Sequence, residues 1–402
     1  MTTGQRIEFY RKRLGMSRPV LGGLVGRSTE WVKAVETGRL HTPRLEMLLK
    51  IARALGIRDL ADLTGDGLAM PVEGFMGEAH VNLPAVQAAL TEYKLATREE
   101  EPLSIPHLAV RLSDAWKVHH SSPNQRTAVG SFLPDLIRDA RQAVRAASGA
   151  DKREARRVLA GVYRLAHMYV AHQPAPDLPL LVADRAVTEG QEADDPHAMA
   201  AGSWCLSSLL RNCGRWDEAT HIADEGSRLL EPWLETTPDD NWRGMWGELQ
   251  FLKGHIEARS GHYGSAWSHW EKANTMAQQL GPSYYHPNTA FSLAGMSASA
   301  VSLNVDLRRA GEAIRTANTF QPETLPSTPW RGRHLIYVAR AYYQRRDYVS
   351  TCGMLDLADQ TAPEIVRYDR FSREMLLSLA DNPPTGMRDV VRDLCGRVGV
   401  RL

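Results

Sequence analysis

One short pattern recurs in the second half of this 402-residue chain, and it constrains the fold more than any other feature. The run from Gly214 to Ala219 reads GRWDEA, and it has counterparts at 261–266, 306–310 and 346–351. The turn aromatics of three of these runs are Trp216, Tyr263 and Tyr348. Successive runs are 41 to 47 residues apart, with helical periodicity on both sides of each turn. A period of this length predicts stacked helical hairpins, with no β-strands required.

Small or apolar residues recur at fixed offsets around these turns. Four and seven residues after the aligned position lie Trp270 and Ala273, Ile314 and Ala317, and Leu355 and Ala358. Twelve residues before it lie Gly254, Ala298 and Ala339, which are small where two helices must approach closely. This arrangement resembles the tetratricopeptide repeat, although the spacing exceeds the usual 34 residues of that repeat. We therefore expect an all-α superhelical repeat domain over 151–402, built of lengthened hairpins.

The first helix of each pair lines the concave face of such a stack. The register above places three arginines, an asparagine and several aromatic residues there. Arginine, asparagine and aromatic side chains can bind a peptide backbone and carboxylate, or an acidic small molecule. The alternative, that these residues only solvate an exposed face, is open for each one taken alone. The predicted effector site consists of Trp204, Ser208, Arg211, Asn212, Phe251, His255, Arg259, Arg340 and Tyr343.

The first 65 residues predict a separate domain of short helices joined by tight turns. Helical periodicity stops at Gly15, resumes after Ser17 and stops again at Gly26. Ser28 then caps a third helix, which ends at Gly38, and a further helix runs from 45 to 55. Serine at a helix start and glycine after a helix end satisfy the unpaired backbone groups at these positions. The four helices can bury one small core.

Charge is distributed unevenly between this domain and the rest of the chain. Residues 1–64 contain 12 Lys and Arg against 6 Asp and Glu, a charge of +6. The remaining residues contain 36 against 41, a charge of −5, so the overall +1 conceals the contrast. A small basic domain on a neutral to acidic body is typical of a protein that binds phosphates through the basic part.

The runs 14–38 and 48–56 together resemble the lambda-repressor-like (Cro/CI, xenobiotic-response-element) helix-turn-helix family. The resemblance implies that the third helix enters the major groove of duplex DNA, where its N-terminal residues reach base edges. The base-reading residues would be Ser28, Thr29, Glu30 and Lys33, and the phosphate-binding residues Arg18, Arg27 and Arg39. Arg18 is a departure, because the family usually has Gln there. The alternative is a helical protein-interaction module.

Two segments separate the basic domain from the repeats. Residues 66–82 are rich in Gly and Met and predict a linker. Residues 83–150 contain helical patches broken by prolines and predict a helical connecting region. Adjacent His119 and His120 in this region are expected to be a surface pair. The four cysteines are too scattered for a disulfide framework or a metal site, and they are expected to be buried thiols.

The whole chain resembles bacterial regulators with an N-terminal helix-turn-helix and a C-terminal repeat domain, including actinobacterial ones. The resemblance implies a homodimer on a palindromic double-stranded DNA operator, with the repeat domain acting as dimerisation surface and sensor of a peptide or small-molecule effector. Dimerisation has independent support, since specific affinity generally needs two half-sites one helical turn apart. The alternative is a DNA-tethered adaptor whose repeat domain recruits a partner protein.

Other classes of protein lack support in the sequence. No run approaches the roughly 20 apolar residues that span a bilayer, and no signal peptide is evident at the N-terminus, so the chain is expected to be cytoplasmic without membrane contact. Phosphate loops, dinucleotide-binding glycines, nucleophile elbows and zinc-protease helices are all absent. We therefore predict a non-enzyme with no catalytic residues, metal site or cofactor.

Overall fold

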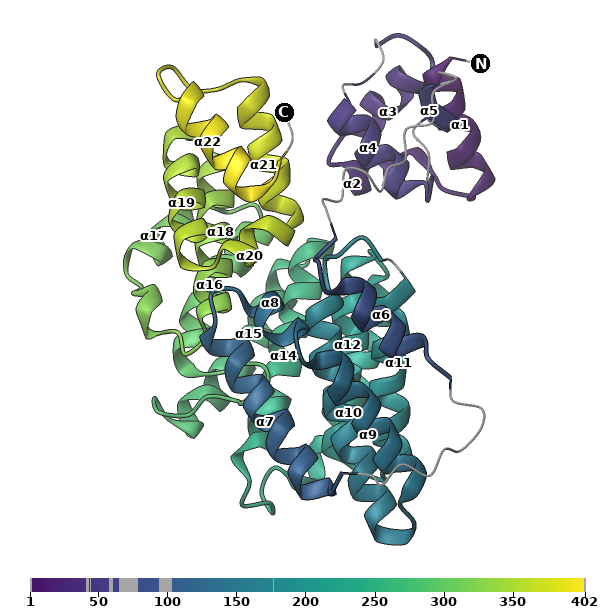
Figure 1. Cartoon of the computed structure of the whole chain (residues 1–402). Coiled ribbons are helices and arrows are strands. Elements are labelled where there is room, and N and C mark those ends of the chain that lie inside the picture. The colour runs from purple at the N-terminus through teal and green to yellow at the C-terminus, as the bar shows by residue number, and fades with distance from the viewer. Residues whose placement is uncertain are drawn as a thin grey trace. The chain divides into compact units, whose positions relative to one another are not determined.

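The computed structural model describes residues 2–40, 43, 45–57, 61–64, 79–93, 103–175 and 177–400. The chain divides into two compact units, a head over 1–78 and a body over 79–402 (Figure 1). Within the described ranges all regular structure is helical, apart from an isolated bridge between Tyr285 and Ser292. None of the helices described is both long and apolar enough to cross a membrane. The expected all-α fold is confirmed, and the predicted linker lies, up to residue 78, outside the described residues.

The head contains five short helices around one apolar core. They are α1 (Thr3–Arg13), α2 (Arg18–Val25), α3 (Thr29–Glu36), α4 (Leu45–Ala54) and α5 (Ala61–Thr64). Every helix contributes at least one residue to the core, including Ile7, Leu21, Val32, Ile51 and Leu63. The four helices predicted from periodicity are therefore present.

The turn between α2 and α3 is fixed by local chemistry. Gly26 ends α2 in the left-handed conformation, with φ of 69°, which only glycine adopts without steric cost. The Ser28 hydroxyl then accepts a hydrogen bond from the Trp31 amide at 3.1 Å and so caps α3. The Ser17 hydroxyl accepts from the Val20 amide in the same way at the start of α2. These caps set the direction in which α3 leaves the turn.

The body contains a series of antiparallel helical hairpins (Figure 1). The hairpins are α10–α11 (Gly149–Val170, Asp177–Glu192), α12–α13 (Pro196–Asn212, Trp216–Leu230), α14–α15 (Asp240–Ser260, Tyr263–Leu280), α16–α17 (Leu293–Asp306, Ala310–Asn318) and α18–α19 (Thr328–Gln344, Tyr348–Thr361). The predicted turn aromatics Trp216, Tyr263 and Tyr348 each begin the second helix of a pair. Three further helices follow, α20 (Pro363–Tyr368), α21 (Arg370–Asp381) and α22 (Arg388–Val398), and short 3-10 turns lie at Glu231–Trp233 and Pro322–Thr324.

The first helices of the hairpins form one continuous layer. Each packs on the next in the order α10, α12, α14, α16 and α18. Small residues permit the close approaches between helices: a Cβ at Gly202 would lie 2.8 Å from the Val187 backbone nitrogen. Gly254 likewise lies against the backbone of Ala266, as the sequence predicts. Ala298 instead borders a cavity described below.

The helices before the first hairpin belong to the same body. They are α6 (Leu83–Thr91), α7 (Ile105–Ser121), α8 (Gln125–Gly130) and α9 (Leu133–Ala146), and they share a hydrophobic core with α10 and α11. We call α7 and α8 the strap: both contact α10, α7 also contacts α18 of the last hairpin, and α8 is bonded to α20. The imidazole of His120 in α7 lies 3.0 Å from the hydroxyl of Ser327, the residue before α18. It also donates to the carbonyl of Asn288, in the loop before α16, at 3.2 Å.

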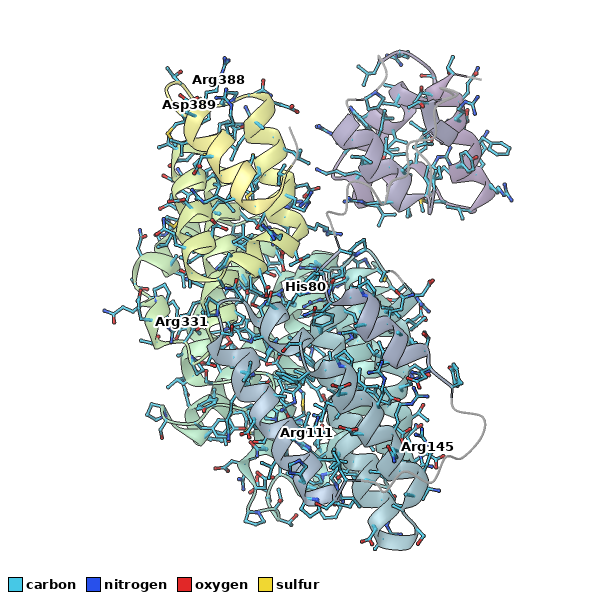
Figure 2. All side chains as sticks on the ribbon, viewed as in Figure 1. His80, Arg111, Arg145, Arg331, Arg388 and Asp389 are labelled. Atoms are coloured by element: carbon cyan, nitrogen blue, oxygen red, sulfur yellow. The ribbon has the colours of Figure 1, made fainter. Side chains whose placement is uncertain are left out.

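A buried polar cluster fixes the other end of the strap. The Glu364 carboxylate of α20 accepts from the Arg126 amide at 2.5 Å and from the Thr127 amide at 3.1 Å. His80, labelled in Figure 2, lies 3.1 Å from the Thr127 hydroxyl and 3.0 Å from the Tyr169 hydroxyl of α10. The cluster thus joins the start of the body to α8, α10 and α20.

Two sequence expectations about single residues are wrong. His119 and His120 are buried, with 6% and 7% of their surfaces exposed, because α7 packs against both ends of the hairpin stack. Cys213 is exposed, since it follows the last residue of α12 in a turn, whereas the other three cysteines are buried thiols as expected.

Candidate functional site

Helix α3 presents a polar edge on the surface of the head. Val32 and Val35 face the core, while Ser28, Glu30 and Lys33 are exposed and Thr29 is partly exposed. Arg27 is also exposed, and its guanidinium lies 5.5 Å from the ring centre of Trp31, close enough for a cation–π contact. Arg39 is exposed beyond the end of the helix. The structure therefore brings most of the predicted DNA-binding residues onto or beside one exposed helix edge.

Arg18 has intramolecular partners that the sequence did not reveal. Its Nε donates to Glu36 at 2.7 Å, and another guanidinium nitrogen lies 3.2 Å from Glu8. Glu36 is almost fully buried and also accepts from Arg11 at 2.5 and 3.0 Å. Burial alone would raise the pKa of Glu36, but the hydrogen bonds from Arg11 and Arg18 lower it below its usual value. Arg18 thus ties the start of α2 to the end of α3.

The layer of first helices in the body borders two adjoining cavities. The first contains about 860 Å³ of free space and the second about 570 Å³, each counted with its opening to solvent. Arg211, Arg333 and Tyr337 line both cavities, so the two meet at these residues. Spaces of this size suit a small molecule or a short peptide segment rather than a folded domain.

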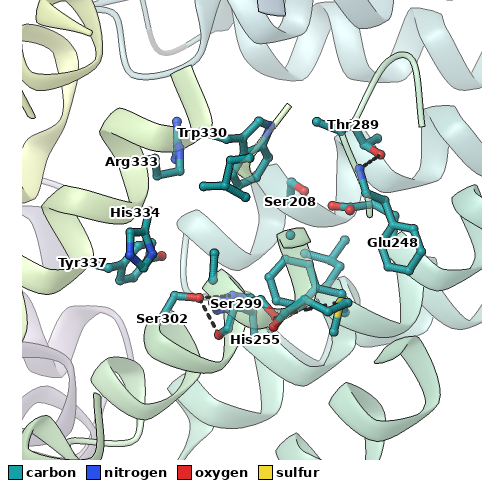
Figure 3. A pocket seen from close by; sticks show the side chains of 18 of the residues that line it. Ser208, Glu248, His255, Thr289, Ser299, Ser302, Trp330, Arg333, His334 and Tyr337 are labelled. Carbon is teal, nitrogen blue, oxygen red and sulfur yellow. Dashed lines mark hydrogen bonds between the residues drawn. The ribbon is translucent and has the colours of Figure 1, made fainter. Parts of the chain in front are cut away.

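The first cavity is largely apolar and aromatic. Its walls include Trp204 of α12, Phe251 of α14, Phe291 of the loop before α16, Met296 of α16 and Trp330 of α18. Figure 3 shows Trp330 and Arg333 across the cavity from Glu248 and Thr289. Such walls exclude water from an apolar ligand and leave a few polar groups to orient it.

Glu248 is a buried carboxyl group in this wall. It is 4% exposed and accepts a hydrogen bond from the Trp204 indole at 3.0 Å. Burial raises its pKa to about 8, although the Trp204 hydrogen bond and the Arg211 charge favour the ionised form. The group is therefore mostly protonated at neutral pH and contributes little negative charge to the cavity.

Asp306, at the end of α16, pairs with three of the predicted effector residues. Its carboxylate lies 3.0 Å from His255 Nδ1, 3.2 Å from Arg259 Nε and 3.3 Å from an Arg340 guanidinium nitrogen. The charges of Arg259 and Arg340, together with the His255 hydrogen bond, hold the pKa of this fully buried carboxyl well below its usual range despite the cost of burial. His255 Nε2 lies 3.1 Å from the Ser302 hydroxyl, so both ring nitrogens have partners. This cluster braces the cavity wall and neutralises part of its positive charge.

The second cavity is lined mainly by basic residues. Its walls contain five arginines with Asp369 as the acidic group, and they are completed by His172, Asn212, Ile336, Tyr337 and Phe371. Arg340 lies 3.7 Å from the ring centre of Phe371. Asp369 accepts from the Ser372 amide at the start of α21. The five arginines are Arg211, Arg259, Arg333, Arg340 and Arg370.

Eight of the nine predicted effector residues line one or both cavities. The exception is Tyr343, which donates to the Ser378 hydroxyl at 2.8 Å because α21 packs against that end of α18. Sequence reasoning missed Arg333, Glu248 and Trp330. Arg333 lies seven residues before Arg340 and Glu248 seven before His255, so extending each helical stripe by two turns would have found both.

Comparisons with known proteins identify the head. Residues 4–63 match a family model described as a helix-turn-helix domain, so the head is a helix-turn-helix domain. No curated protein matches the chain.

Several solved structures resemble the chain at low identity. ComR from S. thermophilus, in complex with DNA and its signalling peptide ComS, is 17% identical with a TM-score of 0.29, over 69% of this chain and 94% of that one. BtubC from P. vanneervenii is 13% identical with a TM-score of 0.31, over 65% and 92%. PlcR from Bacillus thuringiensis, with the peptide PapR7 and DNA, is 10% identical with a TM-score of 0.26, over 88% and 99%. TM-scores of this size do not establish a common fold.

Proposed function

We propose that this protein is a sequence-specific, DNA-binding transcriptional regulator whose activity depends on a peptide or small-molecule effector bound in the body. The single observation that carries the proposal is the helix-turn-helix head, with a third helix whose polar edge is free of the core. Ser28 also caps α3, but core packing does not require Glu30 and Lys33 on that edge. The cavities of the body supply the place for an effector.

In this proposal α3 occupies the major groove and reads base edges. Lys33 donates to guanine, Glu30 accepts from the cytosine amino group, and Ser28 and Thr29 donate or accept at several base edges. Arg27 and Arg39 bind backbone phosphates, which fixes the register without reading sequence. The cation–π contact with Trp31 supports this role for Arg27, since it limits the conformations of the side chain before DNA arrives.

Arg18 combines a phosphate contact with a positioning role. The side chain is 31% exposed, so part of the guanidinium is accessible to a phosphate while Nε remains bonded to Glu36. Because Glu36 lies at the end of α3, the pair holds that helix against α2. This explains how an arginine can occupy a position where related domains usually have glutamine.

We further propose an oligomeric state and a cellular location. A xenobiotic-response-element type of head acting as a homodimer on a palindromic operator would double the few phosphate contacts that one small head makes. We place the protein in the cytoplasm, where it reaches DNA, and assign it no catalytic activity. The repeat domain, over 151–402, would then provide the dimerisation surface and the sensor.

An effector in the cavities has a physical route to the start of the body. Trp330 and Arg333 on α18 line the cavities, and the strap is bonded to the start of α18 through His120. The other end of the strap holds His80 and the Glu364 cluster. A ligand that favours one arrangement of α18 over another would thereby bias the segment that leads to the head.

A gel-shift titration of the full-length protein against its own upstream DNA tests the proposal. We expect a specific complex that resists competitor DNA and weakens steeply as the salt concentration rises. No specific complex at low or at physiological salt would contradict it. If a stoichiometric protein partner is recovered instead, and no ligand alters DNA binding, the protein is an adaptor.

A further inference from the structure

Two arginines at the junction of the cavities form no ion pair with any residue that the structure describes. Arg333 makes no hydrogen bond or ion pair with the described residues, and its guanidinium lies 5.6 Å from the centre of the Trp330 ring. Arg211 Nε is buried without a hydrogen-bond partner in the described part of the chain. Both line both cavities, one from α12 and the other from α18.

The nearby carboxylates compensate these two charges only in part, since the Asp306 charge favours the cationic form of Arg211. Asp306 is already shared by His255, Arg259 and Arg340. Glu248 is mostly protonated at neutral pH, and Asp369 caps α21. The positive charge at the junction is therefore in excess.

Arg211 nevertheless remains a cation at neutral pH. Burial lowers its pKa to about 10, and the charges of Arg259 and Arg333 act in the same direction. Two partly buried cations that repel each other are unfavourable, and an anion bound between them relieves the repulsion. A planar guanidinium is also well suited to bind an oxyanion through two parallel hydrogen bonds.

The walls around the two arginines determine what kind of molecule carries the anionic group. On one side of Arg211 and Arg333 lies the aromatic first cavity, with Trp204, Phe251 and Trp330 in its walls. A ligand that satisfies both parts has an acidic group attached directly to an apolar or aromatic body.

We propose that Arg211 and Arg333 form an anion subsite that binds the carboxylate of the effector, whose apolar or aromatic body fills the first cavity. This inference rests on the proposed function, because it names the chemical class of the effector. The carboxylate belongs either to a free organic acid or to the C-terminus of a short peptide.

Isothermal titration calorimetry on the full-length protein tests the subsite with two matched pairs of probes. The first pair is 4-phenylbutyrate and 4-phenylbutyramide, and the second is N-acetyl-leucyl-phenylalanine and its C-terminal amide. We expect the acid of at least one pair to bind about tenfold or more tighter than its amide, the size of a charge-assisted hydrogen bond. A preference in the first pair identifies a free acid as the source, and a preference in the second a peptide terminus.

Variants test whether Arg211 and Arg333 cause the tighter binding of the acid than of its amide. Arg211→Gln and Arg333→Gln should each reduce this preference to less than about threefold, since one guanidinium of the clamp is lost. Arg228→Gln, which changes an exposed arginine of α13 paired with Glu225, should retain it. Equal affinity of acid and amide in both pairs, a preference unchanged in both cavity variants, or no binding of any probe would overturn the proposal. The comparison of acid with amide needs only the unmodified protein, so a variant that fails to fold does not remove the test.

The calorimetry result for the subsite can be separated from the DNA-binding result for the proposed function. Gel-shift titration of the same preparations reports DNA binding without any ligand. Loss of the acid preference with intact operator binding refutes the subsite alone. An acid preference without operator binding refutes the regulator and leaves the subsite.

Discussion

Glu36 is a charged residue in the interior of the head, and its charge is shared by two arginines. It is 2% exposed and accepts hydrogen bonds from Arg11 and Arg18. Removing one member of a buried ion pair leaves the other charge uncompensated, which generally costs more than the pair contributes. The position of α3 against α1 and α2 therefore depends on Glu36.

Glu36→Gln should therefore destabilise the head by about 3 to 5 kcal/mol. Amide hydrogen exchange of peptides from α1 and α3, measured in the full-length protein, reports this free energy directly. Glu30→Gln, at an exposed position of the same helix, is the matched control and should change it by less than about 0.5 kcal/mol. Unchanged protection in Glu36→Gln would show that Arg11 and Arg18 do not hold α3.

Lys33 and Arg39 should differ in how they affect DNA binding. Lys33→Ala removes a base contact, so we expect a loss of about 1 to 3 kcal/mol on the preferred site and relaxed specificity at one base pair. Arg39→Ala removes a phosphate contact, which should weaken binding to all sequences alike and reduce the salt slope by about 1. Fluorescence anisotropy with matched and mismatched duplexes at several salt concentrations distinguishes the two, and identical behaviour of both variants would contradict the assignment.

Helical register explains which cavity residues the sequence reveals. Arg340, Arg259 and His255 were predicted because they lie on first helices, a few residues before turns whose position the repeat pattern fixes. Their shared partner Asp306 was not, since a carboxylate at the end of a helix reads as solvated until tertiary contacts are known. The same holds for Arg18, whose partner Glu36 lies 18 residues away on another helix.

At the scale of elements, the strap is the feature that the sequence conceals. The hairpins follow from local turn patterns, but α7 and α8 carry no such repeat, and the contact between Arg126 and Glu364 spans 238 residues. Only the folded body shows that one segment touches both the first hairpin and the last. The hydrogen bonds of Glu364 hold that junction closed.

Glu364→Gln should loosen the strap without unfolding the hairpins. The amide side chain keeps the shape but has one acceptor oxygen, so the Arg126 amide or the Thr127 groups lose their partner. We expect exchange in α8 and α20 to rise about tenfold, which corresponds to one lost buried hydrogen bond. Glu323→Gln, at an exposed position, is the control and should leave the exchange rates unchanged. If Glu364→Gln likewise leaves exchange in α8 and α20 unchanged, the Glu364 cluster does not hold the strap.

At the scale of the whole molecule, buried histidines link stability to pH. Burial lowers the pKa of ten histidines in the described part of the body. The pKa is about 4 for His120, His167, His197, His255, His269 and His334, well below the usual value for His119, His172 and His286, and below the usual value for His80. The unfolded chain binds protons at these groups below its ordinary pKa of 6.5, while the folded chain does not. Their contribution to stability is present above pH 6.5 and is lost as the pH falls. Glu248 and Glu189, whose pKa values are raised by burial, act in the opposite direction but are far fewer than the histidines.

We therefore expect the free energy of unfolding of the body to decrease steeply between pH 6.5 and pH 5. Each buried histidine removes up to about 1.4 kcal/mol per pH unit in this range. Urea denaturation of the full-length protein at pH 7.5, 6.0 and 5.0 measures the effect. Equal midpoints at the three pH values would show that these histidines are protonated or accessible in the folded protein.

The central claim is that α3 of the head reads a DNA sequence, and selection from a random duplex library by the full-length protein tests it most directly. We predict enrichment of a sequence with two related half-sites about one helical turn apart. A parallel selection with Lys33→Ala should enrich a site with relaxed preference at the same position in each half. If no sequence is enriched above the starting library, or if the variant enriches the same site with the same preference, then α3 does not read DNA and the account is wrong.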